Sequence, residues 1–327
     1  MLVETGSEHP ARLRVGIIGP GRAGTALGRA LAGAGHRVVA AHAVSDASVH
    51  RVQENFRLAR LADPAEVLGE SDLVLLTVPD DDLPGLVRGL AETDAPLAGR
   101  MLVHASGRHG VRVLDAATRN GALPLALHPV MTFAGREDDL DRIKGTCFGV
   151  TAPDSLRAVA EVLVIEMGGE PVFIPEESRP LYHAALTLAA DHLIALVTEA
   201  AALLEKAAAW QPPSEPSASG QREVAHPDAA LAQAGQPGGV PPGRLLRPLL
   251  AAALDNATRL GDLALTGPAA RGDADSITAD VAALVDASPG AAKAYLALAR
   301  LSAGRALAAG QLRAADARRL LDILGDA

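Results

Sequence analysis

The feature that most constrains this chain is a glycine-rich turn near its N-terminus. The apolar run from Leu13 to Ile18 ends in Gly19-Pro20-Gly21-Arg22-Ala23-Gly24, and an alanine-rich helical pattern follows directly. A strand, three glycines at this spacing and a helix are the parts of a dinucleotide-binding turn. Gly19 permits the tight turn, Gly21 lets a pyrophosphate approach the backbone, and Gly24 lets the helix pack close to the strand. Such a turn can also be purely structural, but the flanking strand and helix favour a cofactor site at residues 19–24, with the N–H groups of the helix start facing the phosphates.

The end of the second strand bears on the choice between NAD and NADP. An Asp or Glu about 20 residues past the glycines usually takes the ribose 2′-hydroxyl of NAD. Here the strand Arg37–Val44 is followed by Ser45, and Asp46 lies one step into the turn, where it would cap the next helix. Arg51 lies one helical turn further on, and its guanidinium fork suits a 2′-phosphate. The sequence therefore favours NADP over NAD, with Ser45 and Arg51 at the 2′-phosphate end.

Strands alternate with helices through the first half of the chain. Apolar strand segments are expected at 13–18, 37–44, 72–79, 100–105, 123–128, 146–151 and 171–174. The run from Asp72 to Pro79 is almost continuously apolar, which is typical of a strand buried on both faces. This alternation predicts an α/β fold, with an N-terminal, doubly wound, mostly parallel Rossmann-like sheet. From Ser178 onward the pattern is helical, which predicts an all-α C-terminal domain.

The expected domain organisation follows from these shifts in pattern. Residues 1–12 are predicted to be a flexible tail, 13–176 an NADP-binding domain and 177–327 a helical substrate and dimerisation domain. Helices of the second domain are expected at 181–210, 245–260, 277–285, 291–309 and 314–324. The stretch 211–243 is dense in Pro, Gly, Ser and Gln, which predicts a flexible insertion. A catalytic lid is the alternative, but the stretch lacks the aromatic and apolar anchors that a lid would need.

Charge and composition exclude several classes of protein. The net charge is −9 and no Lys or Arg cluster stands out, so nucleic acid is not an expected partner. The apolar window from Leu181 to Trp210 is interrupted by charged and polar residues such as Asp191, which predicts a buried helix and not a membrane span. The single Cys147 excludes an intramolecular disulfide and fits a reducing compartment. We expect a cytoplasmic protein with no membrane segment, no targeting segment and no metal site.

Polar residues follow three of the expected strands. They occur in Val78-Pro79, Ser106-Gly107 and His128-Pro129. In an open α/β sheet, ligands bind at the carboxyl ends of the strands. Val78 and Pro79 are therefore expected beside the cofactor, and Ser106 is expected to donate to a substrate carboxylate or carbonyl. His128 could donate a proton, or it could equally be a structural histidine.

Two further groups come from the helical half. Tyr182, His183 and Asp191 recur at helical spacing with Thr187, so His183, Thr187 and Asp191 share a face that could line a cleft between the domains. An exposed stripe or an internal polar network is the alternative. Arg271 lies in the glycine-containing connection Leu265–Asp273 and suits a carboxylate or phosphate. It could also simply pair with an aspartate to hold that connection shut.

These motifs occur together in an order that resembles a known bacterial family. The string consists of Gly19–Gly24, Val78-Pro79-Asp80, His104-Ala105-Ser106-Gly107, Leu127-His128-Pro129 with Phe133, Tyr182-His183-Ala184-Ala185, and Leu265-Thr266-Gly267-Pro268 with Arg271-Gly272-Asp273. The family has a Rossmann-like N-terminal domain and a helical C-terminal domain of unknown function. It is similar to pyrroline-5-carboxylate reductases, β-hydroxyacid dehydrogenases and ketopantoate reductases. The resemblance implies NADPH-dependent reduction of a small carboxylate-bearing ketone or imine, such as ketopantoate in pantothenate synthesis. It also implies a cleft between the domains and a homodimer formed through the helical domains.

Two departures from these relatives leave two hypotheses. The long helix has no lysine before Lys206, where β-hydroxyacid dehydrogenases place one, and Asp191-His192 stands where the closer relatives tend to have Asn-His. In the first hypothesis the chain is an NADP-dependent oxidoreductase, with His128 or His183 as proton donor and Ser106 and Arg271 orienting a small-molecule substrate. In the second it is a regulatory or sensor protein that binds NADP(H) without turnover. An aspartate beside an anionic substrate would have to be protonated or paired with Arg271.

Overall fold

A computed structural model describes residues 12–207 and 241–325. Its N-terminal unit contains an eight-stranded sheet with the strand order β3-β2-β1-β4-β5-β6-β7-β8. Neighbouring strands are parallel, except that β6 and β7 pair antiparallel. The strands are β1 (Arg14–Ile18), β2 (Arg37–His42), β3 (Arg60–Leu61), β4 (Leu73–Leu76), β5 (Met101–His104), β6 (Leu123–Pro129), β7 (Cys147–Thr151) and β8 (Glu170–Phe173). The predicted doubly wound, mostly parallel sheet is confirmed.

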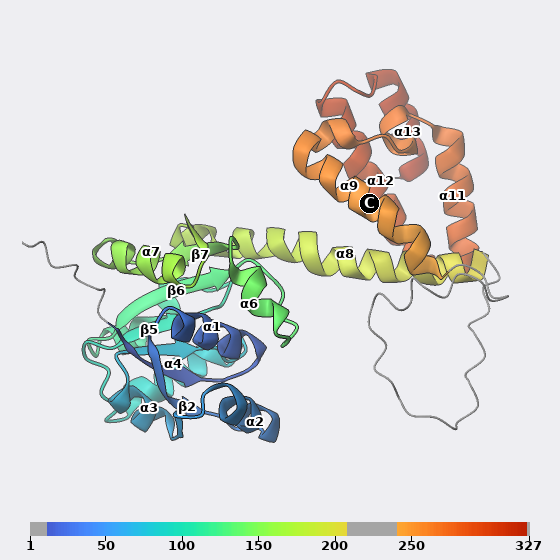
Figure 1. Ribbon diagram of the computed structural model, residues 1–327. Helices are drawn as coiled ribbons and strands as arrows, with labels where there is room; N and C mark the ends of the chain where they lie inside the picture. The colour runs from blue at the N-terminus through green and yellow to red at the C-terminus, as the bar shows by residue number, and fades with distance from the viewer. Residues whose placement is uncertain (1–11, 208–240, 326–327) are drawn as a thin grey trace, which may run out of the picture. The chain divides into compact units, whose positions relative to one another are not determined.

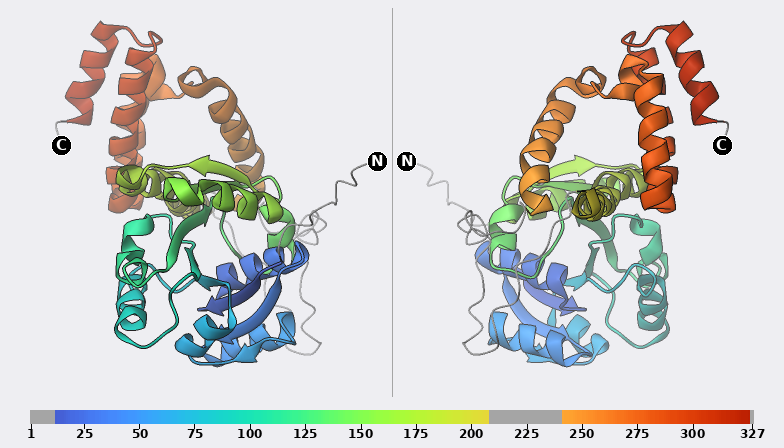
Figure 2. Two further views of the ribbon diagram at one scale, coloured as in Figure 1. Left: turned by 90° about the vertical axis from the view of Figure 1, so that its left-hand side faces the viewer. Right: turned by 90° about the vertical axis from the view of Figure 1, so that its right-hand side faces the viewer.

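Helices cover both faces of this sheet (Figures 1 and 2). They are α1 (Arg22–Gly33), α2 (Asp46–Asn55), α3 (Pro64–Glu70), α4 (Leu83–Glu92), α5 (Asp115–Thr118), α6 (Asp138–Ile143) and α7 (Arg157–Glu166). Buried residues of α1, α2, α6 and α7 form one core cluster with the sheet, and those of α3, α4 and α5 form the other. In β4, Leu73 and Leu75 enter the first cluster while Val74 and Leu76 enter the second. A strand with both faces covered has no polar face, which explains its continuous apolar sequence.

The sequence interpretation missed β3 and α3. Residues 60–70 carry little apolar periodicity, because β3 has only two residues and both are exposed. A local signal for the helix was nevertheless present, since Pro64 is its first residue and the Glu66 carboxylate accepts the Asp63 N–H at 3.1 Å. An acidic residue followed three positions later by Glu is typical of a capped helix start.

The burial of α8 (Arg179–Ala207) differs from the expectation. Arg179 is its buried residue, whereas Leu181, Leu188 and Ile194 are 76%, 60% and 59% exposed. The segment Glu176–Ala207 contains an 18-residue window of mean hydropathy 1.5 with none of it buried, so length and composition alone would allow it to cross a membrane. The core helix of a soluble protein can pass the same test. The prediction of a helix buried within its own chain is wrong, because apolar residues on every side of a helix cannot all be covered by one neighbouring layer.

The chain divides into two compact units between Ala189 and Ala190, inside α8. The second unit also contains α9 (Pro242–Leu260), α10 (Pro268–Arg271), α11 (Ala274–Ala287), α12 (Pro289–Ala308) and α13 (Ala314–Leu324). Ile277, Ala306 and Leu320 are fully buried at the centre of its core. The predicted all-α C-terminal part is confirmed. The expected tail at 1–12 and insertion at 211–243 lie almost entirely outside the described residues.

Candidate functional site

The glycine turn has the geometry that its motif requires. Gly19 has a φ of +85°, which L-residues with side chains rarely adopt. A Cβ atom at Gly24 would lie 2.2 Å from Thr77 Oγ1 and 2.8 Å from Gly19 O, so only glycine lets α1 pack this close to β4. The nearest neighbour of a Cβ at Gly21 would be Gly19 O, 3.9 Å away. Gly21 therefore faces open space, as an approach for a pyrophosphate demands.

A groove of about 830 Å³ opens beside this turn, and we call it the turn groove. It is lined by residues that include Gly19, Pro20, Gly21, Val44, Ser45, Ser48, Thr77, Val78, Pro79 and Arg88. Ser45, Val78 and Pro79, which the sequence analysis assigned to the cofactor, thus line the same groove as the glycine turn. Ser45 Oγ accepts the Ser48 N–H at 3.3 Å and caps α2, so the expectation that Asp46 is the cap is wrong. The backbone of Ser45 is still extended, whereas Asp46 is already helical.

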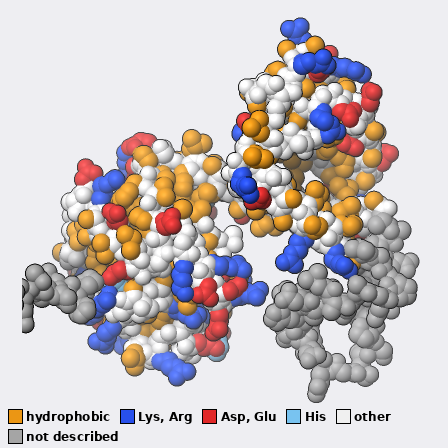
Figure 3. Space-filling view, turned by 45° about the horizontal axis from the view of Figure 1, so that its top comes forward, with side chains coloured by type: hydrophobic (Ala, Val, Ile, Leu, Met, Phe, Trp, Pro, Cys, Tyr) orange, Lys and Arg blue, Asp and Glu red, His pale blue; other side chains and the backbone are white. Residues whose placement is uncertain are grey.

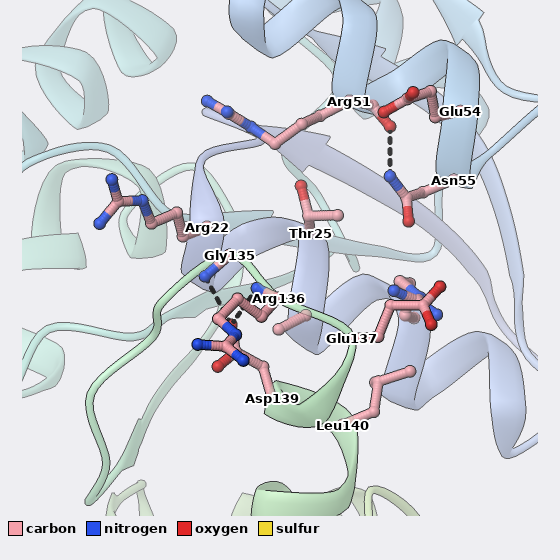
Figure 4. Close-up of a pocket in the computed structure, with 12 residues that line it drawn as sticks. Arg22, Thr25, Arg51, Glu54, Asn55, Gly135, Arg136, Glu137, Asp139 and Leu140 are labelled. Atoms are coloured by element: carbon pink, nitrogen blue, oxygen red, sulfur yellow. Dashed lines mark hydrogen bonds between the residues drawn. The ribbon is translucent and has the colours of Figure 1, made fainter. Parts of the chain in front are cut away.

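Arg51 lies at a second groove, of about 500 Å³, between α1, α2 and the loop that precedes α6 (Figure 4). We call this the arginine groove, because Arg22, Arg29, Arg51 and Arg136 all line it. The Arg51 Nε donates to Pro20 O at 3.2 Å, which connects this groove directly to the glycine turn. Ser45 and Arg51, which the sequence placed together at a 2′-phosphate, therefore line neighbouring grooves.

Two histidines converge beyond the ends of β5 and β6. A Cβ atom at Gly107 would lie 2.9 Å from His128 Nε2 and 3.0 Å from His183 Cδ2. The His128 Nδ1 lies 2.8 Å from the Tyr182 hydroxyl oxygen, and the two rings meet edge to face at 89°. The parallel strands β1 and β6 both end at this edge of the sheet, so His128 and the glycine turn share it.

Burial and charge keep His128 neutral. Burial, with smaller contributions from the nearby Arg179 and His183, lowers the pKa of His128 to about 4 against the opposing effect of Asp80. Burial also raises the pKa of Tyr182, so the phenol keeps its proton. The Tyr182 O–H therefore donates to Nδ1, and the imidazole proton is placed on Nε2, beside Gly107. This arrangement can donate a hydrogen bond from Nε2 to an acceptor while the Tyr182 O–H holds the tautomer.

Arg179 is a functional candidate that the sequence interpretation missed. It is 1% exposed and lies under the Tyr182 ring, 5.6 Å from its centroid. Its guanidinium donates to four acceptors, namely Thr151 Oγ1 at 2.7 Å and the carbonyl oxygens of Gly149, Ala126 and Ser106 at 2.9, 3.2 and 3.3 Å. Burial lowers its pKa. One side chain thus joins the start of α8 to β6, to β7 and to the loop that follows β5.

Ser106 and the missed His104 form a rigid support. His104 is completely buried, its Nδ1 accepts the Ser106 N–H at 3.2 Å, and its Nε2 donates to Gly110 O at 2.9 Å. Burial lowers the pKa of His104 to about 3, so it stays neutral. The Ser106 Oγ accepts the His109 N–H at 3.1 Å and holds this turn. Ser106 is 7% exposed, and its assignment to a substrate stays a prediction.

Asp191 and Arg271 belong to the second unit. Asp191 is exposed on α8. The Arg271 guanidinium donates to Thr266 O and lies 3.8 Å from the Asp273 carboxylate. Arg271 thus closes its own connection in the way that the structural alternative expected, while its role toward a substrate stays a prediction.

The doubly wound sheet with a glycine turn at its carboxyl edge defines a Rossmann-like protein. Residues 3–129 match the family model of a Rossmann-like domain. Residues 146–302 match that of a domain of unknown function, DUF2520. The chain consists of a Rossmann-like domain followed by a DUF2520 domain, which confirms the resemblance to a bacterial family of this architecture. Its relation to pyrroline-5-carboxylate, β-hydroxyacid and ketopantoate enzymes stays a prediction.

Several solved structures share this fold over most of the chain. BF3122 from Bacteroides fragilis, a candidate NADP oxidoreductase, is 21% identical, with 90% of this chain and 98% of that chain covered and a TM-score of 0.66. TM1727 from Thermotoga maritima is 18% identical, with coverages of 90% and 98% and a TM-score of 0.59. A variant imine reductase from Myxococcus stipitatus in complex with NAD+ is 17% identical, with coverages of 95% and 100% and a TM-score of 0.59. No curated protein sequence matches the chain.

Proposed function

We propose that the chain is a cytoplasmic, NADP-dependent oxidoreductase that reduces the C=O or C=N carbon of a small, carboxylate-bearing substrate. The observation that carries the proposal is the His128–Tyr182 pair at the same sheet edge as the glycine turn. The proteins of similar fold support it, because they include a candidate NADP oxidoreductase and an imine reductase in complex with NAD+. Ketopantoate is the first substrate to test.

The residues present fit a dinucleotide. Gly21 is open to an approaching pyrophosphate, and the turn groove beside it is lined by Ser45, Val78 and Pro79. The N–H groups at the start of α1, from Arg22 and Ala23, would face the phosphates. Arg51 would serve the 2′-phosphate, reaching past Pro20. The bound cofactor supplies the hydride, and the protein supplies position and a proton.

His128 acts on the substrate through its neutral imidazole. Because its pKa is lowered to about 4, His128 is not an imidazolium at neutral pH, and its Nε2–H is a hydrogen-bond donor that polarises the acceptor. Tyr182 holds the imidazole in this tautomer by donating its O–H to Nδ1. His183, whose Cδ2 lies at the same face of Gly107 as His128 Nε2, is the second candidate for this role. Ser106 and Arg271 are proposed to orient the substrate carboxylate, with Asp191 on the same helix as His183.

The experiment is single-turnover oxidation of NADPH with ketopantoate, small 2-oxo acids and cyclic imines. His128→Gln and Tyr182→Phe are expected to slow the step, with NADPH affinity unchanged. Gly21→Val is expected to abolish NADPH binding with an intact fold, because its side chain points into open space. A chain that does not bind NADPH refutes the proposal.

The absence of a lysine near His183 on α8 is the observation that favours the regulatory alternative. Lys206 is the first lysine of α8, and its Nζ donates to Ala287 O at 2.7 Å, near the end of the helix. The helix therefore supplies no lysine near His183. Tight NADPH binding without oxidation across the whole substrate panel would favour a sensor and rule out the enzyme.

We further propose that the chain forms a homodimer through its helical part. Exposed apolar side chains cover α8, and a groove of about 480 Å³ in the second unit is lined by α8, α11 and α12, including Leu196, Leu203, Leu284 and Leu298. Figure 3 shows apolar side chains gathered on this unit. Light scattering of the eluting protein should give twice the 33.4 kDa chain mass. Elution as a monomer at micromolar concentration would contradict the dimer.

A further inference from the structure

The loop that follows β5 forms a wall of the histidine site. It comprises residues 105–110, leads into the 3-10 helix η1 (Val111–Leu114), and is called the β5 loop below. A Cβ atom at Gly107 in this loop would lie 2.9 Å from His128 Nε2, 3.1 Å from His128 Cε1 and 3.0 Å from His183 Cδ2. Both imidazoles therefore pack directly against its backbone, and a shift of the loop changes the space that both rings occupy.

Hydrogen bonds within the β5 loop join its two ends. His104 Nδ1 accepts the Ser106 N–H at 3.2 Å, and His104 Nε2 donates to Gly110 O at 2.9 Å. The Ser106 Oγ accepts the His109 N–H at 3.1 Å. Because one buried imidazole bonds to both ends, a displacement of Gly110 is passed on to Ser106 and to the adjacent Gly107.

Glu176 holds the far end of this loop from another part of the sequence. It is half-buried and begins the 3-10 helix η3 (Glu176–Ser178), directly before α8. Its Oε2 accepts the Val111 N–H at 2.8 Å and its Oε1 accepts the Arg112 N–H at 3.3 Å. The first N–H groups of a helix have no acceptor inside it, so the carboxylate satisfies two donors at the start of η1. A Cβ atom at Gly110 would lie within 2.5 Å of the Glu176 Cδ and both carboxylate oxygens, so this carboxylate packs on bare backbone.

The chain that begins with Glu176 also carries the partner of His128. Arg179 follows in the first turn of α8 and donates to Ser106 O at 3.3 Å. The Tyr182 hydroxyl comes next and lies 2.8 Å from His128 Nδ1. The start of α8 thus contacts the β5 loop and the imidazole together, and Glu176 is a tie between the two.

We propose that Glu176 is a positioning residue, which holds the β5 loop against the start of α8 and so keeps Gly107 packed on the His128 imidazole. One hydrogen bond at Nδ1 leaves the ring free to swing about that bond, whereas Gly107 restrains the opposite edge at Nε2 and Cε1. Glu176 thereby fixes the direction of the His128 Nε2–H. This inference rests on the proposed function, in which that N–H donates to the substrate carbonyl or imine. Preorganised donors of this kind lose their effect when they are free to move.

Four variants of the full-length protein separate the contact from the charge. Glu176→Ala removes both acceptors, and Glu176→Gln removes the charge but keeps one acceptor. Gly110 has a φ of −96°, which alanine adopts without strain, so Gly110→Ala pushes the flexible Glu176 carboxylate away and leaves its charge in place. Glu177→Ala is the matched control, because the neighbouring exposed carboxylate carries the same charge and pairs with the Arg112 guanidinium at 2.7 Å.

The first readout is NMR of the His128 imidazole, which requires no substrate. In the wild type the ring should show one tautomer, with its proton on Nε2. Glu176→Ala and Gly110→Ala are expected to let water reach the ring, so that both tautomers are populated and the pKa of His128 rises from about 4 toward 6.5. Loss of a negative charge alone would lower this pKa, so the sign of the shift identifies a loosened loop. The other charged groups that act on His128 are unchanged in every variant, namely Asp80, Arg179 and His183.

The second readout is single-turnover oxidation of NADPH. Glu176→Ala and Gly110→Ala are expected to slow the step by up to about 100-fold, with NADPH affinity unchanged because other residues line the turn groove. Glu176→Gln should recover part of the rate, and Glu177→Ala should match the wild type.

Two outcomes overturn the proposal. One is a wild-type His128 tautomer and pKa in folded Glu176→Ala and Gly110→Ala, and the other is an equal effect of Glu177→Ala. If Glu176→Ala does not fold, Gly110→Ala and Glu176→Gln decide the question by the same measurements. If the wild type oxidises no NADPH with any substrate, the proposed function fails, whereas the NMR comparison still decides the role of Glu176.

Discussion

Acidification from pH 7 to pH 5 is expected to destabilise the N-terminal unit through His104 and His128. Burial lowers their folded-state pKa values from the ordinary 6.5 to about 3 and about 4. Both are neutral when folded, but each takes up a proton in the unfolded chain below pH 6.5. Their contribution to stability is therefore complete above pH 6.5 and is lost as the pH falls toward 4 and 3. At about 1.4 kcal/mol per pH unit and group, roughly 2 kcal/mol per histidine, or about 4 kcal/mol together, is lost by pH 5.

Urea unfolding followed by far-UV circular dichroism at pH 7, 6 and 5 measures this loss. His128→Gln cannot take up the proton, so it should remove about half of the difference in free energy of unfolding between pH 7 and pH 5. His50→Gln is the control, because that side chain is 70% exposed and should leave the difference unchanged. The reasoning is refuted if His128→Gln keeps the full wild-type pH dependence, or if the His128 imidazole titrates near 6.5 by NMR.

Three further substitutions test the packing of the site. Gly24→Ala puts a methyl group 2.2 Å from Thr77 Oγ1 and should cost about 1–3 kcal/mol, with a lower melting temperature and weaker NADPH binding; an unchanged melting temperature would count against it. Gly149→Ala puts a methyl group 2.3 Å from the Tyr182 oxygen and should cost a similar about 1–3 kcal/mol in urea unfolding, whereas wild-type stability would show that Tyr182 can move away freely. Arg179→Met leaves four acceptors without their donor, at about 1 kcal/mol each, and should also raise the pKa of His128 in an NMR titration; an unchanged pKa would remove Arg179 from the electrostatics of the site.

The glycine turn could be predicted from sequence because its requirements are local. The positive φ of Gly19 and the contact between Gly24 and Thr77 follow from a strand, a turn and a helix that are adjacent in the chain or in the sheet. The carboxyl ends of parallel strands lie at one edge, so the meeting of His128 with Gly107 was also within reach. Each of these inferences needed only the order of the elements.

Arg179 could not be predicted in this way, because its partners are scattered. Its acceptors lie 28 to 73 residues away in sequence, on β6, on β7 and in the loop after β5. Nearby Glu176 and Glu177 suggest a local ion pair, but Glu176 accepts the Val111 N–H at 2.8 Å and Glu177 pairs with Arg112. The exposure of α8 could not be predicted from sequence either. Its composition shows that the helix is apolar, but it does not show which part of the protein covers it.

The Arg179 contacts also set where the chain can be cut. A fragment that ends at residue 178 would keep β6 and β7 but lose the donor that the carbonyl oxygens of Ser106, Ala126 and Gly149 share. A buried carbonyl group without a hydrogen-bond partner lowers the free energy of unfolding. Residues of a purification tag placed after residue 178 would not supply the missing guanidinium. The N-terminal unit therefore needs the first turn of α8 to be expressed as a stable fragment. In this protein the first residue of the helix that follows the last strand donates hydrogen bonds to carbonyl groups of the sheet.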